Sequence, residues 1–268
     1  MVETRYVQAP GLRIAYDDSG SGEPIVLVHG LGSSRRRWAD LAGRLRDAGH
    51  RVVTYDLRGF GESEPARTAY GVDDLVKDLS AVVRACDLPA FHLVGHSLGG
   101  MVAQRFALGR PDRLRSLTLV STTSHNGRRA SAFGRAMAEV CERGFDAALR
   151  DREVRTRLEG LLAQAFPGGS PPLDLFRRGL ERPHPAQALA WRATVGFSTK
   201  DRLRELGMPV LVMHGTDDRV IPVIMGQLIH QAIGGSRLHL IEGAGHHPHR
   251  ERPQVVRDHL LAFFTGAG

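Results

Sequence analysis

The 268-residue sequence predicts an α/β fold: a doubly wound, mostly parallel, eight-stranded sheet with an inserted helical cap. Short, unbroken apolar runs recur along the chain, and parallel strands show this pattern when helices cover both faces of the sheet. Helical segments separate the runs, and such alternation is typical of a doubly wound sheet. One long stretch without a strand pattern interrupts the alternation, and it predicts the insertion.

Eight segments are predicted as strands. The first two, residues 5–9 and 12–17, flank a turn at Pro10-Gly11. The other six are apolar runs, at Ile25–Val28, Val52-Val53, Leu93-Val94, Leu117–Val120, Val210–Met213 and Leu238–Ile241. Between and after them, helices are predicted at residues 38–48, 72–86, 98–108, 223–232 and 253–264.

The predicted domains are a core, residues 1–122 and 200–268, and a cap, residues 123–199. Roughly seventy-five residues are too many for a plain connection, so the cap should have structure of its own. Helices are predicted there at residues 130–143 and 154–165, and proline-rich segments at 167–172 and 183–185 divide the helical pieces.

The composition excludes several classes of protein. Hydrophobic residues make up 42% and charged residues 24%, which is ordinary for a globular chain. No apolar run is long enough to cross a membrane and the N-terminus has no signal-peptide core, so we expect a cytoplasmic protein without a membrane partner. The formal net charge is +7, but the arginines are spread along the chain without a binding motif, so we expect no nucleic-acid partner. Cys86 and Cys141 have no zinc-site spacing and are predicted to be free thiols. The oligomeric state is unknown.

The strongest functional signal is Gly95-His96-Ser97-Leu98-Gly99, between a predicted strand and a predicted helix. A turn this sharp strains the backbone of the serine and requires small residues two positions before and after it. It exposes the serine hydroxyl at the carboxyl edge of the sheet, where α/β folds place their sites. We therefore predict that Ser97 is a nucleophile. The alternative is a glycine-rich turn with an incidental serine.

An attacked carbonyl develops negative charge on its oxygen, so two backbone N–H groups must be in place to bind it. The residue after the nucleophile, Leu98, supplies one, and Leu31 in the loop Val28-His29-Gly30-Leu31-Gly32 is the best candidate for the other. His29 is predicted to hold this loop by hydrogen bonding and not to act as the base.

A serine nucleophile needs a base, and the base needs an orienting acid. His246 follows the last strand, with His247 and His249 as rivals; these histidines also allow a weak metal-site interpretation, but we predict no metal and no cofactor. Asp217 and Asp218 both follow the strand at 210–213 and qualify by position as the acid. Either choice gives the chain order Ser, Asp, His.

The chain resembles the α/β-hydrolase superfamily over nearly its whole length. The resemblance is carried by the loop at 29–32, the segment 56–63, the serine turn, Gly215-x-x-Asp218-x-x-x-Pro222 and the late Gly245-His246. It selects Asp218 as the acid and His246 as the base, and it implies that Asp56 and Arg58 belong to a structural turn.

Within the superfamily the chain is most similar to capped carboxylesterases and 3-oxoadipate enol-lactonases. The resemblance implies a serine hydrolase that cleaves a carboxylic ester or lactone through an acyl-enzyme. Haloalkane dehalogenases and epoxide hydrolases have aspartate in place of Ser97. Carbon–carbon hydrolases, cofactor-free perhydrolases and non-enzymatic binders of small ligands remain alternatives.

The expected partner is a small-molecule substrate with an apolar portion. Candidate contacts are Trp38, Phe133, Met137 and Trp191; packing is an equal alternative for Trp38. For most cap side chains packing is favoured, and these include Phe145, Leu162, Phe166, Phe176 and Phe197. Several cap arginines can be interpreted as guides for an acidic substrate, although a solvated surface is the favoured interpretation: Arg128, Arg129, Arg177, Arg178 and Arg192.

Overall fold

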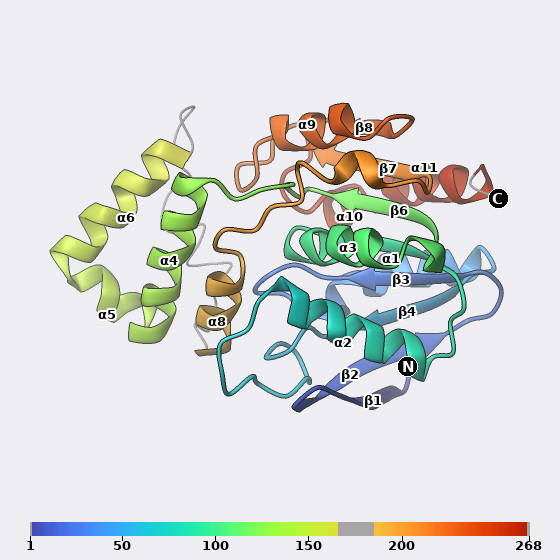
Figure 1. The fold of residues 1–268 in the computed structure, drawn as a ribbon, viewed down its shortest axis with the longest axis horizontal. Coiled ribbons are helices and arrows are strands. Elements are labelled where there is room, and N and C mark those ends of the chain that lie inside the picture. The colour runs from blue at the N-terminus through green and yellow to red at the C-terminus, as the bar shows by residue number, and fades with distance from the viewer. Residues whose placement is uncertain (1, 166–184, 267–268) are drawn as a thin grey trace.

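A computed structural model describes residues 2–165 and 185–266. Its eight strands form one sheet in the order β1-β2-β4-β3-β5-β6-β7-β8 (Figure 1). β1 and β4 pair antiparallel with β2, and the remaining neighbours are parallel. This confirms the predicted fold class. The strands are β1 (Thr4–Ala9), β2 (Leu12–Ser19), β3 (Pro24–Val28), β4 (Arg51–Tyr55), β5 (Phe91–His96), β6 (Leu114–Val120), β7 (Val210–Gly215) and β8 (Arg237–Ile241).

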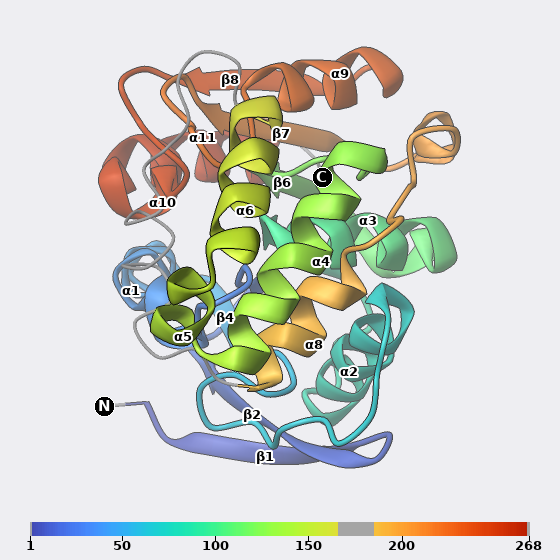
Figure 2. The same ribbon diagram turned by 90° about the vertical axis from the view of Figure 1, so that its left-hand side faces the viewer.

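Helices cover both faces of the sheet because its central strands are apolar on both sides (Figure 2). Ile25 and Leu27 of β3 pack against the layer formed by α1 (Ala39–Asp47) and α11 (Pro253–Thr265). Val26 and Val28 of the same strand belong to the opposite layer. That layer contains α2 (Val72–Ala85), α3 (Leu98–Gly109) and α9 (Ile224–Ala232).

The predicted core helices are present, with small shifts at their ends. The first helix begins at Ala39 and not at Trp38, because the 3-10 turn η1 (Arg35–Trp38) precedes it. The last helix is preceded by α10 (Pro248–Glu251), a single short turn that the sequence pattern did not indicate. None of these shifts moves a predicted site residue away from the end of its strand.

Between β6 and β7, four described helices lie together at one end of the molecule (Figure 1). They are α4 (Arg128–Arg143), α5 (Phe145–Arg150), α6 (Arg152–Ala165) and α8 (Pro185–Ala193). They have an apolar core of their own, in which Met137, Leu158 and Ala188 are buried. A helical insertion of this kind needs such a core to be stable.

The chain enters and leaves the cap through two segments that lie side by side. His125 and Ser198 form an isolated antiparallel bridge, although no strand pattern is present in this part of the sequence. On either side of it, the Asn126 N–H donates to the Phe197 carbonyl and the Thr199 N–H to the Ser124 carbonyl, both at 2.8 Å. The predicted boundaries, residues 123 and 199, flank this pairing.

Asp56 and Arg58 have the structural role that the resemblance implied. Asp56 is fully buried and accepts backbone N–H groups of Arg35, at 2.6 Å, and Glu62, at 2.9 Å, as well as the Arg35 guanidinium. The buried Arg58 guanidinium donates two hydrogen bonds of 2.7 Å to the Asp78 carboxylate. Both groups therefore fix loops of the core.

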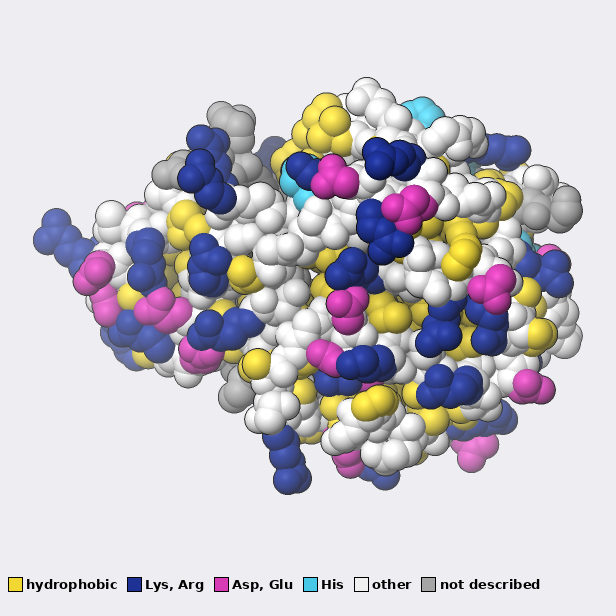
Figure 3. Space-filling model, viewed as in Figure 1, with side chains coloured by type: hydrophobic (Ala, Val, Ile, Leu, Met, Phe, Trp, Pro, Cys, Tyr) yellow, Lys and Arg dark blue, Asp and Glu magenta, His cyan; other side chains and the backbone are white. Residues whose placement is uncertain are grey.

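The surface and the cysteines are consistent with an ordinary globular chain. On the face shown in Figure 3, basic side chains are spread among acidic and apolar ones. Cys86 and Cys141 are free and buried, as predicted. No helix in the described ranges is long and apolar enough to span a bilayer.

Candidate active site

Ser97 stands at the junction of β5 and α3 in the strained conformation that its motif predicts. Its φ is 53° and its ψ is −118°. Four hydrogen bonds hold this turn. The Ser97 N–H donates to the Val120 carbonyl at 3.0 Å, and the Ser97 carbonyl accepts the Thr122 hydroxyl at 2.7 Å and the N–H groups of Gly100, at 2.9 Å, and Met101, at 3.2 Å. A residue other than glycine keeps such a φ only where its surroundings enforce it. The contacts thus fix the position of the side chain.

The glycines of the motif are explained by direct backbone contact. A Cβ atom on Gly95 would lie 2.3 Å from the Gly99 carbonyl oxygen, and one on Gly99 would lie 2.3 Å from the Val28 carbonyl oxygen. Real Cβ atoms do not approach backbone so closely, so larger residues would force the strand, the turn and the helix apart. The close packing is what allows β5 to turn directly into α3.

Ser97, His246 and Asp218 form a continuous hydrogen-bonded chain. The Nε2 atom of His246 lies 3.2 Å from Ser97 Oγ, and its Nδ1 atom lies 2.8 Å from Asp218 Oδ2. Because a carboxylate only accepts, Nδ1 carries the proton and Nε2 is left to accept the proton of the serine. The geometry matches a nucleophile, a base and an orienting acid.

Asp218 is held by several donors on the loop after β7. Its Oδ1 accepts the N–H groups of Val220, at 2.8 Å, and Ile221, at 2.9 Å, and the Nε2 of His214 lies 3.2 Å from Oδ2. Burial raises the pKa of this carboxyl, but His246 and the hydrogen bonds from His214 and His246 outweigh it and hold the pKa below its usual range. Asp218 is therefore charged over the physiological range. Asp217, its rival by position, is exposed.

Leu31 and Leu98 lie beside Ser97 in the same pocket wall. Within the described part of the chain, neither of their backbone N–H groups has a hydrogen-bond acceptor. As predicted, His29 holds the loop before Leu31: its Nδ1–H donates to the Gly30 carbonyl at 2.7 Å, and its Nε2 accepts the Leu57 N–H at 3.0 Å. The two free N–H groups are where an oxyanion would be bound, and this role remains a prediction.

His96 is a site residue that the sequence did not single out. Its Nε2–H donates to the backbone carbonyl of His246 at 2.8 Å and so ties the serine turn to the loop of the base. The histidine in the middle of Gly95-His96-Ser97 was its only signal. No sequence pattern indicates that its partner lies 150 residues away.

The donor nitrogens of His96, His247 and His249 lie within 4.8 Å of one another, which is a different trio from the one considered in the sequence. Burial first, and then the neighbouring histidines, lower the pKa of His96 and His249, and burial lowers that of His247 to about 4. Arg37 and Arg250 add positive charge beside His247 and His249, which opposes a cation. We therefore assign no metal to this trio.

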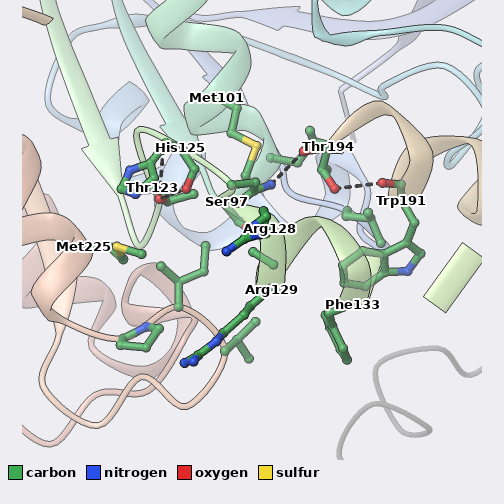
Figure 4. Close-up of a pocket in the computed structure, with 18 residues that line it drawn as sticks. Ser97, Met101, Thr123, His125, Arg128, Arg129, Phe133, Trp191, Thr194 and Met225 are labelled. Atoms are coloured by element: carbon green, nitrogen blue, oxygen red, sulfur yellow. Dashed lines mark hydrogen bonds between the residues drawn. The ribbon is translucent and has the colours of Figure 1, made fainter. Parts of the chain in front are cut away.

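A cavity of about 520 Å³ opens in front of Ser97, between the sheet edge and the cap (Figure 4). Its volume is in the range of small-molecule sites. The core contributes Leu31, Leu98 and Met101 to its wall, and the loop after β7 contributes residues 220–222. The cap side includes Phe133 and Trp191, together with Arg128 and Arg129 at the start of α4.

Two of the predicted substrate contacts are wrong. Trp38 is fully buried in the core, with its ring centroid 4.2 Å from that of His249, and is not part of the cavity wall. Met137 is fully buried in the apolar core of the cap, because it lies on the face of α4 that packs against the other cap helices. The other two, Phe133 and Trp191, line the cavity with their rings in an edge-to-face arrangement at 5.6 Å.

The remaining cap candidates either lie away from the cavity wall or fall outside the described part of the structure. Phe197 is buried in the core of the main domain. The Arg192 guanidinium does not line the cavity and pairs with Glu142 at 2.8 Å. Phe166, Phe176, Arg177 and Arg178, and the side chains of Phe145 and Leu162, lie outside the described part of the structure.

Comparison with known proteins identifies the family of the chain. Residues 23–253 match the alpha/beta hydrolase fold family. The chain belongs to this family. Among its relatives, a 2-hydroxy-6-oxo-2,4-heptadienoate hydrolase from Pseudomonas putida is 31% identical over 96% of both chains.

Solved structures of the same family superpose along nearly the whole chain. A thermophilic esterase from Thermogutta terrifontis gives a TM-score of 0.79 at 26% identity and covers 99% of each chain. A bromoperoxidase from Bacillus anthracis gives a TM-score of 0.77, also at 26% identity, over 98% of this chain and 100% of its own. Family membership therefore makes this chain a hydrolase, while its relatives differ in the reaction that they are named for.

Proposed function

We propose that the protein hydrolyses a carboxylic ester or lactone through a covalent acyl-enzyme on Ser97. The observation that carries this proposal is the chain of hydrogen bonds from Ser97 through His246 to Asp218, with the serine at the wall of a cavity. A serine hydroxyl is a weak nucleophile unless a base takes its proton, and His246 Nε2 is the acceptor within reach.

The reaction has two steps. Ser97 Oγ attacks the carbonyl carbon while His246 accepts the proton, and the N–H groups of Leu31 and Leu98 bind the resulting oxyanion. His246 then gives the proton to the alcohol oxygen as the carbon–oxygen bond breaks. Water, deprotonated by His246, attacks the acyl group and releases the acid and Ser97. Asp218 keeps the proton of the neutral imidazole on Nδ1 and stabilises the charged form.

The test is hydrolysis of p-nitrophenyl acetate and butyrate. We expect the wild type to turn over both esters and Ser97→Ala to lose the activity by a factor on the order of 10³ or more. Ser21→Ala, in an exposed loop that does not line the cavity, is the control and should retain wild-type rates. Activity that survives Ser97→Ala would exclude Ser97 as the nucleophile.

A carbon–carbon hydrolase with the same triad is the second candidate, and the Pseudomonas putida relative favours it. The substrate in the name of that relative is an unsaturated keto acid without an ester bond, so hydrolysis of it must break a carbon–carbon bond. A panel of aryl diketone acids beside the simple esters separates the two reactions. Turnover of the diketone acids alone would replace our first proposal with the second.

A further inference from the structure

The cavity in front of Ser97 has two chemically different halves. Phe133 and Trp191 form an apolar surface, with their rings in edge-to-face contact. Arg128 and Arg129 also line the cavity, and in Figure 4 both side chains extend from the start of α4 away from Phe133 and Trp191. A ligand that fills this space therefore meets aromatic rings at one part and guanidinium groups at another.

The charge of the cavity is one-sided. Its described lining includes the guanidinium groups of Arg128 and Arg129, and it includes no aspartate or glutamate. The acid of the hydrogen-bonded chain, Asp218, is already engaged by His246 and by the backbone of its own loop. An anionic group on a ligand would thus meet positive charge in the cavity without a competing carboxylate.

Within the described part of the chain, neither Arg128 nor Arg129 has a hydrogen bond or an ion pair with another residue. Two cap arginines outside the cavity differ in this respect: Arg143 pairs with Asp151, and Arg192 pairs with Glu142. An arginine presents a planar fork of N–H donors that matches a carboxylate, and such bonds are stronger than those between neutral groups. The two cavity arginines are free to make them.

We propose that Arg128 and Arg129 bind a carboxylate of the substrate, so that the enzyme prefers esters or lactones that carry an acidic group beside an apolar portion. This inference rests on the proposed function, since it describes the substrate class of the same site. It assigns the two residues to substrate binding and leaves the bond-breaking steps to Ser97 and His246. The favoured sequence interpretation, a solvated surface, is replaced for these two arginines alone.

The test uses two pairs of chromogenic or fluorogenic esters that differ only in charge. p-Nitrophenyl hydrogen adipate and its methyl ester place the charge on the acyl side; 4-acetoxybenzoate and methyl 4-acetoxybenzoate place it on the alcohol side. For each pair the ratio of kcat/KM, acid over neutral ester, is measured for the wild type, Arg128→Gln/Arg129→Gln and Arg135→Gln. Arg135 is the matched control, because it is exposed on the same helix outside the cavity wall.

We expect the wild type to prefer the acid in at least one pair, and the double variant to lower that ratio on the order of tenfold. Arg135→Gln should leave the ratio at its wild-type value. Raising the salt concentration should reduce the preference of the wild type, because the arginines are exposed and the attraction is screened. An unchanged ratio in the double variant, or an equal fall in Arg135→Gln, would overturn the proposal.

A binding measurement separates this proposal from the proposed function. The Kd of p-nitrophenyl hydrogen adipate and of its methyl ester is measured by calorimetry with Ser97→Ala, which cannot form the acyl-enzyme, with and without the two arginine substitutions. If the wild type hydrolyses no ester, the ester hydrolase proposal fails, yet tighter binding of the acid that depends on Arg128 and Arg129 would still support the carboxylate site. Equal binding of acid and methyl ester would overturn that site, whatever the enzyme hydrolyses.

Discussion

The sheet edge that holds Ser97 and the cap wall that faces it differ in how tightly they are built. A methyl group on Gly99 would meet the Val28 carbonyl at 2.3 Å, whereas one on Gly127, at the start of α4, would meet nothing within 4 Å. At the sheet edge the buried Asp218 is fully hydrogen-bonded, while on the cap wall Arg128 and Arg129 are exposed. The chemistry is thus fixed by close packing, and the substrate preference is set by residues whose replacement costs little stability.

The largest expected difference between the two regions comes from one added methyl group. Gly99→Ala should lower the free energy of unfolding by about 3 kcal/mol or more, because the new Cβ meets backbone that cannot move without separating β3 from α3. Gly127→Ala should cost at most about 1 kcal/mol, since it loses only a favourable helix N-cap. Urea unfolding measures both. Similar losses in the two variants would contradict the contrast.

Lowering the pH should reduce stability through the histidines at the sheet edge and not through the arginines of the cap wall. Burial lowers the pKa of His96, His247 and His249 in the folded protein, with His247 at about 4, whereas an unfolded histidine has a pKa of about 6.5. The folded state then binds fewer protons than the unfolded state between these values. Stability should therefore be complete above about pH 6.5 and fall by on the order of 3 kcal/mol or more toward pH 4.

Urea unfolding at pH 7.5, 5.5 and 4 measures this loss. His247→Gln removes one of the titrating groups and should show a smaller decrease over the same range. The arginines of the cap wall keep their charge over this range, so they add nothing to the pH dependence of the free energy of unfolding. A free energy of unfolding that stays constant from pH 7.5 to 4 would mean that these imidazoles are not held neutral by burial.

The smallest effect is expected at a cap arginine that lies outside the cavity. Arg192→Ala removes an exposed ion pair with Glu142, and such pairs contribute less than about 1 kcal/mol. It should also leave the preference for acidic over neutral esters unchanged, in contrast to Arg128 and Arg129. A changed KM for acidic esters alone would place Arg192 in substrate binding. It would contradict the division between arginines that line the cavity and arginines that pair outside it.

The fold and Ser97 follow from local sequence signals, whereas the resemblance to the α/β-hydrolases selects Asp218 and His246 from their neighbours. A parallel strand buried on both faces is recognisable from its unbroken apolar run, as at residues 25–28. The glycines around Ser97 report a backbone contact directly, and Gly215 and Pro222 frame Asp218. These signals lie within a few residues of the group that they identify.

The pocket could not be derived in the same way, because its wall depends on how the cap helices pack. Trp38 and Met137 have the size and apolarity of pocket residues, but the face of the helix or turn on which they lie decides that they are buried. Arg192 pairs with Glu142, 50 residues away in the chain, whereas Arg128 lines the cavity. A single sequence contains no local signal for a contact between residues so far apart in the chain.

The pairing of His125 with Ser198 at the base of the cap has an evolutionary consequence. Since the chain departs and returns at neighbouring points, the distance that an inserted segment must span is the same whatever its length. Insertions are tolerated best where their ends are close together and the surrounding backbone is undisturbed. The cap is therefore an exchangeable part: a lineage can replace it wholesale and acquire a new substrate while inheriting the same reaction.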